Sequence, residues 1–227
     1  MPLPVGSARL YQMKITLKGI EPPIWRRFVV PTFMKLSHFH VILQHIMGWE
    51  NIAASEFLIN GNRFAEMGDY EVTEDGLIGL DAYDAANYEL SQLLKSGMKF
   101  TYIYDFENHW EHEIVVENDN FNRNVEHPYF CFEGDRACPP EGCEGPEGYA
   151  TVLEVLNDPD HPEHEECKEW LGTRFSSERY LPDESNRELG VRRPGFLIDD
   201  TKDRDRDAER KKKKQERQRK KEARKRR

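Results

Sequence analysis

The chain has no long apolar run. No stretch of its 227 residues approaches the about 20 apolar residues that a helix needs to cross a membrane. Residues 1–12, MPLPVGSARLYQ, also lack the apolar core of a secretion signal. The sequence therefore predicts no membrane partner and a cytoplasmic protein, or a nuclear one in a eukaryotic host.

Cysteines and catalytic signatures are scarce as well. The chain has 4 cysteines, which in a reducing compartment are thiols or metal ligands rather than disulfides. It contains no GxSxG, no P-loop, no GxGxxG after a strand and no HExxH. These absences exclude the signatures of common hydrolases, nucleotide-binding enzymes and zinc proteases, and they favour a protein that is not an enzyme.

Charge is abundant, and the two signs are segregated. Residues 202–227 hold 16 lysines and arginines against 6 acidic residues, a net charge of +10. Because the whole chain carries −9, the residues before this tail carry −19. An anionic body attracts basic proteins, whereas a cationic tail neutralises phosphates and releases their counterions. The pattern therefore predicts a basic protein partner for the body and nucleic acid for the tail, or a tail that folds back onto the body.

The tail is polar on every face of a helix and has no aromatic residue. It therefore cannot pack as an amphipathic helix or stack on bases, and its binding to nucleic acid would be salt-sensitive and independent of base sequence. A nuclear localisation signal and a solubilising extension are the alternatives. The candidate nucleic-acid-binding residues are Arg210, Lys211, Lys212, Lys213, Lys214, Arg217, Arg219, Lys220 and Lys221.

The residues before the tail predict one α+β domain. Residues 10–20 alternate apolar and polar side chains, and residues 24–30 follow as an antiparallel partner. Residues 37–48 have helical periodicity with Ser37 as N-cap, and the histidines of this helix, His38, His40 and His45, are expected at the surface or its boundary. Further strands are expected at 55–59, 98–106 and 109–117, with a hairpin turn at Asn60-Gly61-Asn62 after the first of them. A loop is expected over 118–145, followed by helices after Gly145 and His161, the second of which ends before Gly172. We assign residues 8–196 to this domain, with a mixed or antiparallel sheet packed with helices, and 197–227 to the tail.

Two arginines follow each other on the second predicted strand. Adjacent side chains point to opposite faces, so one of Arg26 and Arg27 must lean toward the core. A salt bridge to one of the many carboxylates is the expected way to satisfy it.

The predicted hairpin over residues 98–117 places a histidine near a carboxylate. With Glu107-Asn108 as a two-residue loop, Asp105 and His112 become diagonal neighbours on one face. A carboxylate that fixes the tautomer of a histidine suits a metal ligand or a general base. It is also an ordinary way to satisfy a half-buried histidine.

A loop that follows this hairpin holds three cysteines with the spacing C-x6-C-x4-C. The spacing differs from the paired CxxC of zinc fingers, but thiolates in a loop rich in Gly and Pro suit organisation by one ion. The candidate zinc ligands are Cys131, Cys138, Cys143 and His112. Three partly buried thiols without a metal are the alternative.

Several segments resemble the plasmid pRiA4b ORF-3-like family. They are YQMKITLKGIEPPIWRRFVVP with LSHFHVILQHIMGW, FTYIYDFENHWEH, and ACPPEGCEGPEGY followed by HPEHEECKEWLG. The resemblance extends to about Leu189 and implies a single α+β domain associated with plasmids and insertion elements, without a defined activity. The family usually has Gly-Asp where this chain has Glu107-Asn108, and Asp-Cys-Gly at 142–144, where this chain has Gly-Cys-Glu.

These observations favour a non-catalytic binding or adaptor domain, associated with a mobile element or with nucleic acid through its tail. One alternative is a metal-dependent enzyme that acts on nucleic acid, with Asp105, His112 and the cysteine loop at its site. The other is an acidic mimic of nucleic acid that binds a basic protein.

Overall fold

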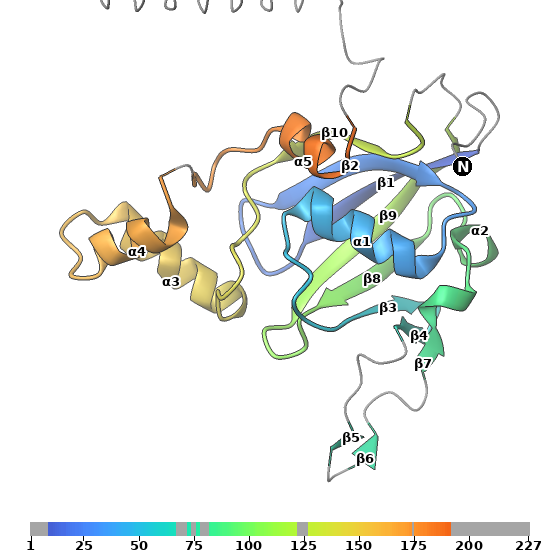
Figure 1. Ribbon diagram of the computed structural model, residues 1–227, viewed down its shortest axis with the longest axis horizontal. Helices are drawn as coiled ribbons and strands as arrows, with labels where there is room; N and C mark the ends of the chain where they lie inside the picture. The colour runs from blue at the N-terminus through green and yellow to red at the C-terminus, as the bar shows by residue number, and fades with distance from the viewer. Residues whose placement is uncertain are drawn as a thin grey trace, which may run out of the picture. The chain divides into compact units, whose positions relative to one another are not determined.

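The computed structural model describes residues 9–66, 72–73, 76–77, 82–121, 127–173 and 175–191 (Figure 1). An eight-stranded sheet runs through this part of the chain in the order β10-β2-β1-β9-β8-β3-β4-β7. Neighbouring strands are antiparallel except β4 and β7, which are parallel. This mixed sheet and its helices confirm the predicted α+β class.

The strands of the sheet are β1 (Leu10–Leu17), β2 (Ile24–Pro31), β3 (Ser55–Ile59), β4 (Asn62–Ala65), β7 (Ala82–Asp84), β8 (Lys99–Tyr104), β9 (Trp110–Phe121) and β10 (Phe130–Asp135). A separate ladder pairs β5 (Val72–Thr73) with β6 (Gly76–Leu77). The helices are α1 (Leu36–Met47), α2 (Leu90–Leu93), α3 (Gly145–Asn157), α4 (His164–Leu171) and α5 (Pro182–Glu188), with a 3-10 turn, η1 (Ala85–Asn87).

The core lies between one face of the sheet and α1, which runs across that face in Figure 1. Along β1, Met13 and Ile15 are buried while Lys14 between them is half-buried, which is the period-two pattern that the sequence predicts. Phe39 of α1 stacks on Phe57 of β3 with 5.7 Å between ring centroids. Such aromatic pairs contribute about 1 kcal/mol of stability beyond that from the area that they bury.

The opposite face of the sheet carries charges in matched pairs. Arg27 on β2 donates hydrogen bonds to Glu117 on β9, at 2.8 Å, and to Glu133 on β10. Lys99 on β8 pairs with Glu113 on β9 at 3.2 Å. Cations on neighbouring strands therefore neutralise carboxylates on this face.

The structure corrects three local predictions. Helix α1 begins at Leu36 after the N-cap Lys35, so Ser37 lies inside the first turn and does not cap it. His40, expected near the surface, is buried, with its Nδ1 2.8 Å from the Tyr102 hydroxyl. Strand β10 falls within the stretch predicted as a loop, because its pairing to β2 depends on distant residues.

Contacts divide the chain into two units between residues 193 and 194. The second unit, 194–227, lies outside the described residues. The candidate nucleic-acid-binding residues from Arg210 to Lys221 belong to it.

Candidate functional site

The β8–β9 hairpin has a longer loop than the two residues predicted. The loop spans residues 105–109, and the register places Tyr102 opposite His112. Asp105 has a φ of 57°, and its carboxylate accepts a hydrogen bond from Asn108 Nδ2 at 2.6 Å. The predicted contact between Asp105 and His112 is therefore wrong, because this carboxylate turns back into its own loop.

His112 is a neutral core residue in this structure. Its Nδ1 lies 3.3 Å from the carbonyl oxygen of Tyr102, and a carbonyl only accepts, so Nδ1 carries the hydrogen. Burial lowers the pKa of His112 to about 4. Its Nε2 has no partner among the described residues, and neither have Trp49 Nε1 and the Tyr149 hydroxyl. Such buried polar atoms are places where proteins hold ordered water.

The four cysteines are free thiols, and among the described residues none is hydrogen-bonded to His112. Cys131 is buried on β10, with its Sγ 3.0 Å from the Tyr180 hydroxyl. Cys143 is buried just before α3, and burial raises its pKa to about 11. Burial also raises the pKa values of Cys131 and Cys138, so these thiols are weak nucleophiles at pH 7.

The four predicted zinc ligands, Cys131, Cys138, Cys143 and His112, are all among the described residues. Within the described ranges, no group of three or more His, Cys, Asp or Glu residues is arranged to hold a metal ion. The structure therefore does not bring these four side chains together as a site.

Arg26 is the arginine that points into the core, and backbone carbonyls satisfy it. Its Nε donates to Ile46 at 3.1 Å, and its Nη1 donates to Trp25 and Asp135, both at 2.8 Å. The guanidinium carbon lies 3.5 Å from the ring centroid of Tyr180. Among the described residues no carboxylate forms an ion pair with Arg26, so the expected salt bridge is wrong for this side chain. Arg26 is thus a structural anchor between β2, β10 and the segment before α5.

Helices α3 and α4 form a hairpin beside the sheet, and we call residues 145–173 the acidic hairpin. Helix α3 begins at Gly145, whose φ is 71° and where a Cβ would come within 2.9 Å of the Asn108 carbonyl oxygen. The two helices lie side by side (Figure 1). His164 of α4 ties them together, because its Nδ1 bonds the Val155 carbonyl of α3 at 3.0 Å.

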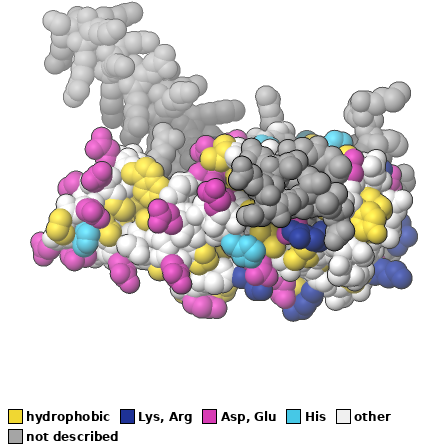
Figure 2. Space-filling model, turned by 90° about the horizontal axis from the view of Figure 1, so that it is seen from below, with side chains coloured by type: hydrophobic (Ala, Val, Ile, Leu, Met, Phe, Trp, Pro, Cys, Tyr) yellow, Lys and Arg dark blue, Asp and Glu magenta, His cyan; other side chains and the backbone are white. Residues whose placement is uncertain are grey.

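The surface of the acidic hairpin is strongly negative. Residues 145–173 contain 8 acidic residues and one basic residue, Lys168. All eight carboxylates are exposed; they belong to Glu147, Glu154, Asp158, Asp160, Glu163, Glu165, Glu166 and Glu169. Figure 2 shows Asp and Glu side chains over this end of the molecule and the Lys and Arg side chains gathered toward the other end. Cations on neighbouring strands match carboxylates of the sheet, whereas among the described residues of the hairpin only Glu165 pairs with a lysine, Lys168.

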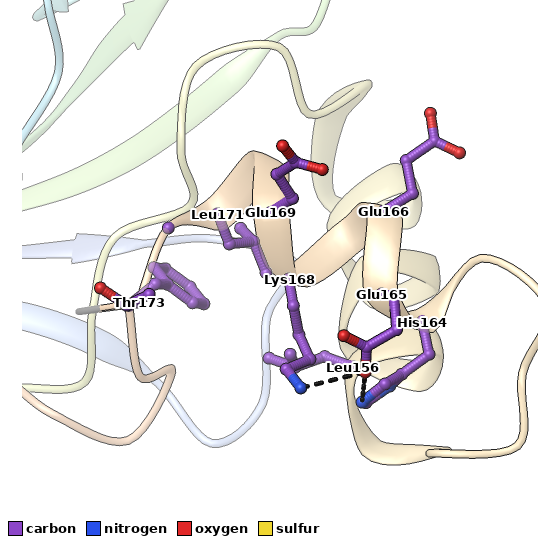
Figure 3. A pocket seen from close by; sticks show the side chains of 10 residues that line it. Leu156, His164, Glu165, Glu166, Lys168, Glu169, Leu171 and Thr173 are labelled. Carbon is purple, nitrogen blue, oxygen red and sulfur yellow. Dashed lines mark hydrogen bonds and ion pairs between the residues drawn. The ribbon is translucent and has the colours of Figure 1, made fainter.

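A hollow with a volume of about 830 Å³ lies along α4 (Figure 3). Its lining joins apolar side chains, Leu156, Leu171 and Phe175, with the carboxylates Glu165, Glu166 and Glu169. Trp170, on the same helix, is 49% exposed. The hairpin therefore combines negative charge with apolar surface, a composition that suits recognition of basic, partly apolar groups.

The sequence holds a signal for this surface that the prediction did not use. The net charge of the whole body hides the fact that residues 145–173 alone carry −7. Counting charge over each predicted helix pair would have located the patch.

The described residues include no helix that is long and apolar enough to span a membrane.

Comparisons with known proteins place the chain among relatives without an assigned activity. It is 39% identical over 168 residues to the uncharacterized protein y4hQ of Sinorhizobium fredii (strain NBRC 101917 / NGR234), covering 73% of this chain and 82% of that protein. Its fold matches the crystal structure of a protein of unknown function from Methanosarcina mazei Go1, with a TM-score of 0.68 and 29% identity over 78% of this chain and 97% of that one. The sequence model of the plasmid pRiA4b ORF-3-like proteins matches residues 9–184. The chain belongs to the plasmid pRiA4b ORF-3-like family.

Proposed function

We propose that the domain is a non-catalytic binding module that takes a basic segment of a partner protein on the acidic hairpin. The observation that carries this proposal is the exposure of all eight hairpin carboxylates with one lysine among them. Opposite charges steer association and set specificity, and unpaired surface carboxylates supply that field.

An exposed aromatic side chain strengthens the proposal. Trp170 lies on α4 among Glu166 and Glu169, and half of its surface is exposed. Tryptophan is enriched among the residues that dominate binding energy, and its ring face attracts Lys and Arg cations. A basic segment would therefore meet both a charged field and an aromatic anchor.

The test compares two variants of the full chain that lose the same amount of charge. The hairpin variant changes four exposed glutamates to glutamine: Glu147, Glu163, Glu166 and Glu169. The control variant changes four exposed glutamates outside the hairpin: Glu21, Glu50, Glu66 and Glu107. Fluorescence anisotropy measures the binding of a labelled peptide of about twelve residues that alternates arginine and alanine.

The hairpin variant should bind the peptide at least about tenfold more weakly than the parent, because each exposed pair contributes up to about 1 kcal/mol. The control variant should stay within about threefold, and added salt should weaken parent binding. Equal losses in both variants would refute the hairpin as the binding surface, since net charge alone would then account for the affinity.

The tail favours a second function, the binding of nucleic acid without base preference. Its net charge of +10 over residues 202–227 is the supporting observation. Affinity for a duplex DNA should fall steeply with salt in the full chain, with a slope of about −0.9 for each phosphate contacted. Deletion of residues 202–227 should abolish that affinity. Unchanged, salt-insensitive binding after the deletion would contradict a role of the tail.

A further inference from the structure

The hollow along α4 has two kinds of wall. Leu156, Leu171 and Phe175 line it with apolar surface, and Glu165, Glu166 and Glu169 line it with carboxylates. Figure 3 shows the Glu165 carboxylate beside His164, and those of Glu166 and Glu169 on the other side of α4. These two glutamates form no ion pair with any other described residue. A ligand that fits both walls has an aliphatic part and a cationic end.

One buried side chain in this lining has an unused polar atom. His164 is only 8% exposed. Its Nδ1 donates to the Val155 carbonyl oxygen at 3.0 Å, so in the neutral ring Nε2 is a hydrogen-bond acceptor. Glu165 Oε1 lies 3.9 Å from Nε2, which is beyond hydrogen-bond distance. Nε2 can therefore accept a hydrogen bond from a ligand.

Lys168 holds the carboxylate beside this histidine. Its Nζ lies 3.1 Å from Glu165 Oε1, and Figure 3 shows that carboxylate between Lys168 and His164. The lysine side chain is half exposed, so it competes with any incoming cation without being part of the core. It is the one basic residue of the hollow's lining.

We infer that the hollow receives an arginine side chain of the basic segment, with its guanidinium donating to His164 Nε2 and to a carboxylate of α4. The inference rests on the proposed function and names the side chain that the hairpin selects. A guanidinium presents five donors in a planar fork, so one group can reach an imidazole nitrogen and a carboxylate together. The methylene stem then lies against the apolar wall. A lysine ammonium is a compact point charge and matches this pair less well.

The experiment uses the full chain and three peptides of about twelve residues, alternating alanine with arginine, lysine or citrulline. The arginine peptide should bind about fivefold more tightly than the lysine peptide, and the neutral citrulline peptide should bind weakest. Equal affinities for the arginine and lysine peptides would overturn the inference.

Single variants locate the arginine in the hollow. Glu169→Gln should weaken binding of the arginine peptide about threefold, whereas Glu154→Gln should not, because Glu154 lies two residues from Leu156 and faces away from it. Lys168→Gln should tighten binding about twofold to threefold, since it frees Glu165. His164→Gln should remove the preference for arginine over lysine. Should that variant fail to fold, Lys168→Gln and Glu169→Gln still decide, because both side chains are exposed.

The outcomes separate this inference from the proposed function. If the four-glutamate hairpin variant loses binding while Lys168→Gln and Glu169→Gln behave like Glu154→Gln, the hairpin binds basic segments but the hollow does not select arginine. If the four-glutamate variant binds as the parent does, the proposed function itself fails.

Discussion

Replacing Arg26 by alanine should lower the free energy of unfolding by about 3 kcal/mol. The side chain is 1% exposed and makes three hydrogen bonds to carbonyl oxygens, at 2.8, 2.8 and 3.1 Å. At the lower end of about 1.5 kcal/mol for each hydrogen bond to a charged group, these contribute about 5 kcal/mol. The Tyr180 ring 3.5 Å away adds about 1–2 kcal/mol. Because alanine carries no charge, the variant avoids several kcal/mol of desolvation cost, so the net loss in the free energy of unfolding is about 3 kcal/mol.

The neighbouring Arg27 is the matched control, because it lies on the same strand with its side chain on the other face. Arg27→Ala breaks partly exposed ion pairs with Glu117 and Glu133 and should cost about 1 kcal/mol. Arg26→Lys keeps the charge but lacks the planar guanidinium with its several donors, so most of the loss in the free energy of unfolding should remain. Urea denaturation of the full chain at pH 7, followed by tryptophan fluorescence, measures all three. Equal losses for Arg26→Ala and Arg27→Ala would refute the anchoring role of Arg26.

Three further predictions concern single residues of the domain. Gly134→Ala should cost more than about 2 kcal/mol, because its Cβ would lie 2.5 Å from Tyr180 Cε1; a urea midpoint equal to that of the parent would contradict this packing. The pKa of His112 is lowered from 6.5 to about 4 by burial, so the unfolded chain binds the extra proton between these values. The stability that the neutral His112 contributes is therefore complete above pH 6.5 and falls by up to about 3 kcal/mol as the pH drops toward 4. Over the same pH range, the free energy of unfolding of His112→Phe should decline less steeply than that of the parent. An unchanged pH dependence would count against a neutral histidine. Tyr149→Phe should leave the thermal midpoint equal or higher, because the hydroxyl has no partner among the described residues; a clear loss would reveal a bound water or ligand there.

The sequence predicted the elements whose signals are local. The alternation of Met13 and Ile15 with Lys14 predicted β1, and Asn60-Gly61 predicted the β3–β4 hairpin, where both residues have positive φ. Gly145 and Gly172 marked the start of α3 and the end of α4. These features depend on side-chain periodicity and on backbone conformations that few residues adopt.

Features that depend on distant contacts were missed. The register around His112 depends on a loop in which Asp105 adopts a left-handed conformation, and a slip of one residue changes every facing pair. Strand β10 is stabilised by pairing to β2 and by the Asn186 side chain, which bonds both backbone groups of Cys131. No local pattern in residues 130–135 predicts the pairing to β2 or the bonds to Asn186.

The candidate surface was partly predictable. The overall negative charge of the body follows from composition alone, and it favoured a basic partner. The position of the charge on two adjacent helices, and the placing of His164 against Val155, required the fold. The predicted zinc ligands do not form a metal site among the described residues, because closeness in the sequence does not fix the directions of side chains on different elements.

An amide NMR titration of the full chain with the arginine–alanine peptide tests the binding surface most directly. If the acidic hairpin receives the basic segment, the shifted amides will gather in residues 145–175, with the largest changes near His164 and Glu169. Shifts centred on the sheet, with those of the hairpin unchanged, would contradict the proposed binding surface.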